Sequence, residues 1–162
     1  MSKTGSLTNT TVRLGAEELR FRITAAETDG ELVAVDVTMP PGGGPPMLHR
    51  HACTELYLVR GGAFAIYRQD AAGGTLERLE ARAGDVVLLA AGVSHTVRNE
   101  SAAPADAHVV FTPGDQMERF VRAAAGARSV DEVLALAARH GVEMTGPAPA
   151  PPQPNRPVPT TW

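Results

Sequence analysis

The chain has 162 residues, 43% of them hydrophobic and 20% charged, which is the size and composition of a single globular domain. Fifteen basic residues against 18 acidic ones give a net charge of -3, so no basic field is available to bind nucleic acid. A single cysteine, Cys53, excludes a disulfide within the chain. No apolar run approaches the ~20 residues that cross a bilayer, and the first residues lack the apolar stretch of a secretory signal. We therefore expect a cytoplasmic protein with neither nucleic acid nor membrane as a partner.

The stretch from about residue 11 to residue 112 has the pattern of β-strands. Apolar residues alternate with polar or charged ones over 19–23 and again over 33–39, which gives each strand one dry face. Gly61 and Gly62 form a two-residue hairpin signal. Strands are expected at 19–23, 33–39, 54–60, 63–68, 86–89 and 107–112. Short strands with frequent turns and no long helix between them predict an antiparallel sandwich or barrel.

Two short helices are expected after the strands, over about 113–141. Thr112 followed by Pro113 predicts a capped helix start, and Gly126 predicts that helix's end. A capping box at 129–132 predicts a second helix, which ends at His140. Their apolar stripes are expected at Met117, Phe120, Val121 and Ala124, and at Val133, Leu134, Leu136 and Ala137. We expect both helices to lie against the outer surface of the β domain.

The end of the chain, residues 146–162, holds seven of the 13 prolines. Prolines this dense cannot continue a helix or donate to a sheet ladder, so they predict an extended, flexible tail. The domain is therefore expected to span residues 1–145. Trp162, the last residue, belongs either to an arm that docks on a neighbouring subunit or to a plain flexible terminus.

Four residues in two separated segments are the candidate metal ligands. His49 and His51 are one residue apart, so both side chains leave the same face of a strand, and Glu55 has the same parity. A third histidine, His95, lies at the end of a later strand. Buried ionisable groups are costly unless they are paired or bind a metal. Imidazole and carboxylate together suit Fe, Ni, Co, Mn, Cu or Zn, so we expect one divalent transition metal ion per chain.

The spacing around these residues resembles the paired motifs of the cupin superfamily. The first motif has two glycines, His-x-His and Glu, and it falls on Gly43, His49, His51, Glu55 and Gly62. The second motif falls on Gly84, Gly92, His95 and Asn99. Ala90 stands where the family has proline, which is expected to cost loop rigidity without touching a ligand. The resemblance implies an all-β fold, a double-stranded β-barrel or jelly roll, with His49, His51, Glu55 and His95 as metal ligands.

One motif pair followed by two helices and the 141–147 segment is similar to quercetinase-like single-domain cupins. That resemblance implies an O2-dependent dioxygenase for a small phenolic or enolic metabolite, in which Glu55 takes the hydroxyl proton of the substrate. It also implies a homodimer. Two alternatives stay open: a non-redox metal-dependent isomerase, cyclase or lyase of natural-product biosynthesis, and a metal-containing ligand-binding cupin without turnover.

A substrate pocket is expected from inward-facing side chains, although apolar residues at period two more often belong to plain core. The candidates are Met39, Met47, Tyr57, Phe64 and Phe111. Tyr57 either packs in the core or offers its hydroxyl to the substrate. Cys53, His108 and His140 are expected to be structural.

Overall fold

The computed structural model describes residues 10–70 and 72–151. The strands in these residues are β1 (Thr11–Leu14), β2 (Glu17–Ile23), β3 (Val33–Met39), β4 (Met47–Arg50), β5 (Thr54–Gly61), β6 (Ala63–Gln69), β7 (Glu77–Arg82), β8 (Val86–Leu89), β9 (Ser94–Arg98), β10 (Ala105–Thr112) and β11 (Glu143–Pro147). A short 3-10 turn, η1 (Ala25–Glu27), precedes β3, and two helices, α1 (Asp115–Ala125) and α2 (Val130–Arg139), follow β10.

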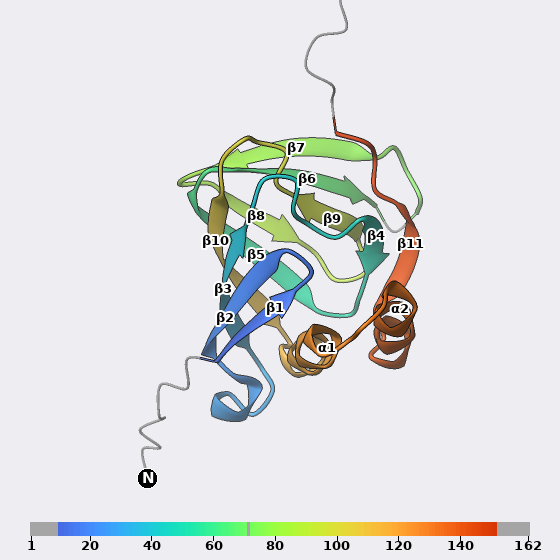
Figure 1. Cartoon of the computed structure of the whole chain (residues 1–162). Coiled ribbons are helices and arrows are strands. Elements are labelled where there is room, and N and C mark those ends of the chain that lie inside the picture. The colour runs from blue at the N-terminus through green and yellow to red at the C-terminus, as the bar shows by residue number, and fades with distance from the viewer. Residues whose placement is uncertain (1–9, 71, 152–162) are drawn as a thin grey trace, which may run out of the picture.

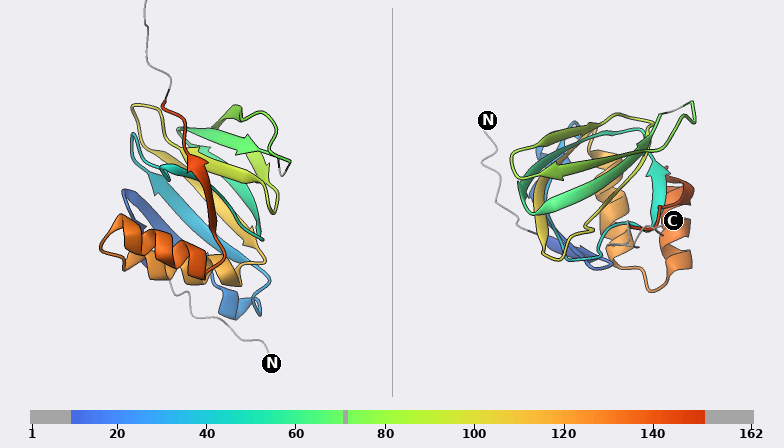
Figure 2. Two further views of the ribbon diagram at one scale, coloured as in Figure 1. Left: turned by 90° about the vertical axis from the view of Figure 1, so that its right-hand side faces the viewer. Right: turned by 90° about the horizontal axis from the view of Figure 1, so that it is seen from above.

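The strands form two antiparallel sheets that face each other as a barrel (Figure 1 and Figure 2). The first sheet has the order β1-β2-β3-β10-β5-β8, and the second has the order β11-β4-β9-β6-β7. Alternation along β10 shows why the sheets close on one another, since Ala107, Val109 and Phe111 are buried while the residues between them are only half-buried. The inward residues of both sheets join one buried cluster. The predicted all-β jelly roll with two helices is confirmed.

The helices begin and pack somewhat differently from the prediction. Thr112 does not cap α1, because it remains in the β10–β5 ladder opposite Thr54, and the N-cap is Gly114. Ser129 does cap α2, since its hydroxyl accepts the backbone N–H of Glu132 at 3.2 Å. The expected end of α1 at Gly126 is also confirmed.

The apolar face of α1 is also the predicted one. Met117, Phe120, Val121 and Ala124 are buried, and they belong to the same cluster as the barrel interior. The helices therefore do not lie on the outer surface of a sheet. They lie together at one end of the barrel and complete its core (Figure 1). In the part of the chain that the structure describes, no helix is long and apolar enough to cross a membrane.

The proline-rich segment begins later than predicted. Pro147 still belongs to β11, opposite Met47 of β4, and the backbone N–H of Ala148 donates to the Pro46 carbonyl at 2.9 Å. A proline is tolerated there because β11 is an edge strand and pairs with β4 alone. Residues 152–162, with Trp162, lie outside the described residues.

Candidate metal centre

The four predicted ligands meet inside the barrel, although they come from both sheets. His49 of β4 stands directly opposite His95 of β9, and His51 follows the end of β4. Glu55 is the second residue of β5 and reaches the histidines from the other sheet. One ligand atom from each of the four residues lies within 4.8 Å of the others. His95 is the second residue of its strand rather than its end, because β9 begins at Ser94.

Backbone carbonyls orient the three imidazole rings. The Nδ1 atoms of His49, His51 and His95 lie 3.2, 3.0 and 2.9 Å from carbonyl oxygens two residues away in each case. An Nδ1–H that donates to a carbonyl fixes the tautomer and leaves the lone pair of Nε2 free for a metal. The donor set therefore fits a divalent transition metal ion, with three imidazole nitrogens and one carboxylate.

The charges at the centre also suit a cation. Burial alone would raise the pKa of Glu55, but hydrogen bonds from His51 and His95 outweigh it and hold that pKa well below its usual range. The Glu55 Oε1 atom lies 2.6 Å from His51 Nε2 and 3.3 Å from His95 Nε2. Burial, reinforced by the charge of His95, lowers the pKa of His49 to about 4. At neutral pH the centre thus presents a carboxylate and a neutral His49 imidazole, which are the protonation states that bind metal.

The motif asparagine is a structural tie between the two motifs. The Asn99 amide nitrogen donates to the carbonyls of Met39 and Ala103 at 2.9 and 2.7 Å, and its backbone N–H donates to Gly43 at 3.0 Å. Nearby Gly44 has φ +114°, and a Cβ on it would collide with the Val97 carbonyl. The loop before β4 is therefore fixed against β9, the strand that carries His95.

The loop that lacks the family's proline at Ala90 is held by hydrogen bonds to the first motif. The backbone N–H of Gly92 donates to the carbonyl of His51 at 2.9 Å, and that of Ala91 donates to Thr54 Oγ1 at 3.3 Å. The segment leading to His95 is thus attached to the candidate ligand His51 and to Thr54, which precedes the candidate ligand Glu55. These contacts offset the loss of rigidity expected from alanine.

The predicted pocket residues are mostly packed in the core. Met39, Tyr57, Phe64 and Phe111 are buried in the main cluster, whereas Met47 is half-buried. Their role in binding a substrate stays a prediction.

The remaining candidate side chains stand beside the centre or outside it. Burial, and then the charge of Glu55, raises the pKa of the Cys53 thiol to about 12, so this residue is a neutral filler beside His51. His108 pairs with Asp36 on the outside of the barrel. His140 is the C-cap of α2.

The sequence missed two residues that flank the histidine pair. A row of directly opposed residues crosses the second sheet from Met144 through His49, His95 and Arg68 to Glu77. Directly opposed residues point to the same face of a sheet, so Met144 and Arg68 share the inner face with the histidines. Arg68 has the parity of the buried Phe64 and Ile66 and could have been found from it, but β11, which carries Met144, was not predicted.

Glu17 is a third residue that the sequence did not single out. It has the parity of Leu19 and Phe21 in β2, which places it on the inner face. Burial raises its pKa to about 7 against the opposing hydrogen bond from the Gly44 backbone. Its charge also raises the pKa of Tyr57, after burial and Glu55. The interior therefore holds a second carboxyl group besides Glu55.

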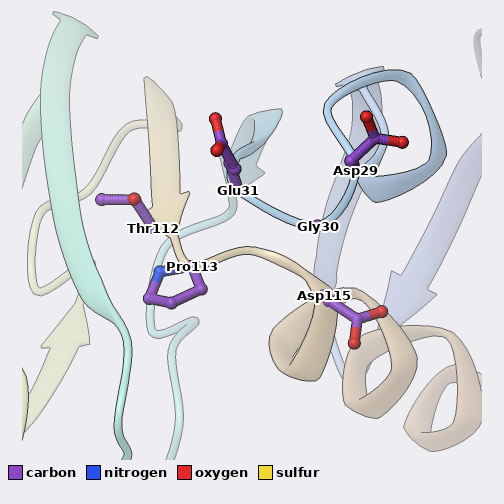
Figure 3. Close-up of a pocket in the computed structure, with 6 residues that line it drawn as sticks. All are labelled: Asp29, Gly30, Glu31, Thr112, Pro113 and Asp115. Atoms are coloured by element: carbon purple, nitrogen blue, oxygen red, sulfur yellow. The ribbon is translucent and has the colours of Figure 1, made fainter.

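A separate hollow lies on the surface between the loop before β3 and the start of α1 (Figure 3). Asp29, Glu31 and Asp115 line it, but their carboxylates point in different directions. Within the described residues, the group of side chains suited to a metal is the His49, His51, Glu55 and His95 cluster.

The fold and the site together define a jelly-roll barrel that encloses a cluster of three histidines and one glutamate with the donors for a metal ion. The family model for the cupin domain matches residues 35–111, which include both motifs. Together with the jelly-roll fold, this match confirms the resemblance to the cupin superfamily that the motifs indicated. Comparison with curated proteins gives no match.

Solved structures share the barrel at low sequence identity. An oxalate oxidase is 20% identical with a TM-score of 0.54, and the match covers 84% of this chain and 79% of that one. A predicted oxalate decarboxylase from Thermotoga maritima is 20% identical with a TM-score of 0.52, over 59% of this chain and 79% of that one. A mutant of the Bacillus subtilis oxalate decarboxylase is 20% identical with a TM-score of 0.57, over 66% of this chain but only 28% of that enzyme. At these identities the likeness shows the fold alone.

Proposed function

We propose that the protein is a metal-dependent dioxygenase for a small phenolic or enolic metabolite. The observation that carries the proposal is the buried Glu55 carboxylate, which lies within 3.3 Å of two imidazole nitrogens in a four-donor cluster. A divalent transition metal ion held by His49, His51, Glu55 and His95 would supply Lewis acidity, redox activity and one or two open coordination positions.

The role of Glu55 is that of a general base. Its low pKa keeps it ionised at neutral pH, and its burial keeps competing water away. Transfer of the substrate's hydroxyl proton to this carboxylate leaves a phenolate or enolate, which is more electron-rich than the neutral substrate. In a dioxygenase reaction both atoms of O2 then enter the organic product.

The comparisons support an enzyme and leave the reaction open between two classes. The names of the similar structures include an oxalate oxidase and an oxalate decarboxylase, so this barrel is found with oxidative and with other chemistry on small acids. The dioxygenase is favoured here because the sequence also resembles the quercetinase-like type in its order of motifs and helices.

The test measures O2 consumption by protein purified without chelators and assayed for metal content. We expect O2 uptake with at least one member of a panel of flavonols, catechols and enols, with both atoms of 18O2 recovered in the product. Glu55→Gln is expected to keep bound metal and to lose most turnover, while Arg82→Gln, on the outside of β7, serves as the control. Substrate loss without O2 uptake would establish the non-redox alternative instead. Thermal stabilisation by a compound that is never consumed would establish the binding alternative.

The homodimer stays a prediction with a physical motive. β8 is an edge strand, and its Val86 and Leu88 side chains are 63% and 52% exposed. Covering such an edge removes apolar surface and unpaired backbone groups from water. Light scattering on the purified protein would give the mass directly.

A further inference from the structure

Arg68 is a charged residue placed next to the candidate metal ligands. It stands directly opposite His95 in the β6–β9 pair, and His95 stands directly opposite His49. Directly opposed residues have Cβ atoms roughly 5 Å apart and point to one face of the sheet. The Arg68 side chain therefore leaves β6 on the same face of the sheet as His95.

The guanidinium group keeps part of its hydrogen-bonding capacity. Its Nε donates to Glu77 Oε2 at 2.8 Å, and among the described residues Glu77 is the one hydrogen-bond partner of this side chain. Both side chains are partly exposed, at 37% and 53%, so the pair is weak and easily exchanged. The terminal nitrogens of Arg68 can bind a carboxylate through two parallel hydrogen bonds.

Arg68 also lines a hollow in the surface, whose lining does not include the four candidate metal ligands. It lies between β7 and β8, the edge strands of the two sheets, where the barrel is open. Arg68 is the one basic residue in its lining, beside the carboxylates of Asp70 and Glu77, and apolar walls come from Leu79, Val87 and Val93. Val93 is two residues before His95 in the loop of the second motif. A flat molecule in this hollow would lie against these apolar walls and meet Arg68, which stands directly opposite the ligand His95 in the sheet.

We propose that Arg68 binds an acidic group of the substrate, which makes the substrate a phenolic or enolic acid rather than a neutral phenol. This inference rests on the proposed function, because it assumes that the substrate's hydroxyl reaches the metal cluster. The carboxylate of the substrate displaces Glu77 from Arg68, while the apolar walls of the hollow hold the ring. Arg68 is thus a specificity-determining residue.

The experiment compares 3,4-dihydroxybenzoate with catechol, which carries the same adjacent hydroxyls and no carboxylate. Binding is measured by calorimetry on protein loaded with Zn²⁺, which accepts the same donors and is redox-inert, so no turnover intervenes. We expect the acid to bind about tenfold more tightly than catechol, the effect of one charge-assisted contact at a partly exposed site. Arg68→Gln is expected to abolish this preference and to leave catechol binding unchanged.

Control substitutions on the same hairpin separate the contact of Arg68 with the acid from a general effect of net charge. Arg82 is the control for Arg68, and Glu80 is the control for Glu77. Arg82 and Glu80 lie on the outer face of β7, so Arg82→Gln and Glu80→Gln change the net charge as Arg68→Gln and Glu77→Gln do. Only the Arg68 variant should lose the preference for the acid. Glu77→Gln should strengthen acid binding severalfold because it frees Arg68, and this keeps the test informative if Arg68→Gln does not fold.

The outcomes distinguish the two proposals. Equal binding of acid and catechol by the unchanged protein, or an unchanged preference in both inner-face variants, overturns the role of Arg68 and leaves the proposed function standing. Failure of both compounds to bind the metal-loaded protein overturns phenol binding at the cluster, and the role of Arg68 with it.

Discussion

Replacing Glu17 with glutamine should change how the stability of the fold depends on pH. Burial raises the pKa of Glu17 from its ordinary value of 4.5 to about 7, so the folded chain holds this proton more tightly than the unfolded chain does. Between these two pH values the folded state binds more protons, and its stability therefore falls as the pH rises. The proton on Glu17 stabilises the folded state fully below the pKa of the unfolded chain, 4.5. This stabilisation is lost as the pH rises past the pKa of the folded chain, about 7.

The size of this effect follows from the pKa difference. At ~1.36 kcal/mol per pH unit, the step from 4.5 to about 7 corresponds to ~3 kcal/mol as an upper bound. Glu17 retains some contact with solvent, so we expect ~1–3 kcal/mol. A neutral glutamine fits the same space and does not titrate.

The assay is urea unfolding of the unchanged protein and of Glu17→Gln at pH 5 and pH 8. From pH 5 to pH 8, the free energy of unfolding of the unchanged protein should fall by ~1–3 kcal/mol more than that of Glu17→Gln. Only the unchanged protein must ionise a buried carboxyl over this range. Glu18→Gln is the control, since Glu18 is the next residue of β2 and its side chain is exposed beside Arg13. A free-energy difference that is the same at both pH values would refute the burial of an ionisable Glu17.

Three further substitutions test the site and its supports. His95→Ala should reduce bound metal from one ion per chain to a small fraction, as measured by elemental analysis of protein that remains folded by circular dichroism; full occupancy would show that His95 is not a ligand. Asn99→Ala should lower the free energy of unfolding by ~2–3 kcal/mol, because it leaves the buried Met39 carbonyl without its side-chain partner, and a loss below ~0.5 kcal/mol in urea would contradict that role. Ser129→Ala should cost ~1 kcal/mol through loss of the α2 cap, and an unchanged melting temperature would contradict that role.

The features that the sequence predicted correctly depend on local spacing. His49, His51 and Glu55 lie within seven residues of one another, so the short connection from β4 to β5 brings Glu55 across to the two histidines. The buried face of α1 follows in the same way from the 3.6-residue period, and Gly126 ends that helix as expected. In each case the physical cause acts within a few residues, so one segment contains all the information.

The features that were missed depend on which strands become neighbours. β7 reads Glu-Arg-Leu-Glu-Ala-Arg, and because the charged Glu77 stands at an inward position beside Leu79 and Ala81, its alternation is weak. β11 ends in proline and looks like the start of the tail until β4 is known to lie beside it. The closure of the whole barrel decides which strands pair. A short segment of the sequence therefore does not predict the partner of its strand.

The same distinction explains why the metal ligands could be identified before the groups around them. A ligand set needs particular side chains at fixed spacing, so it leaves a pattern in the chain. The position of Arg68 beside His95 is instead a product of register, because a shift of one residue in the β6–β9 pairing would turn its side chain to the outer face. On the proposal made for Arg68, substrate preference follows from the pairing of β6, which carries no metal ligand, with β9, which carries His95. Two chains with identical ligand motifs can differ in preference through a single position such as Arg68.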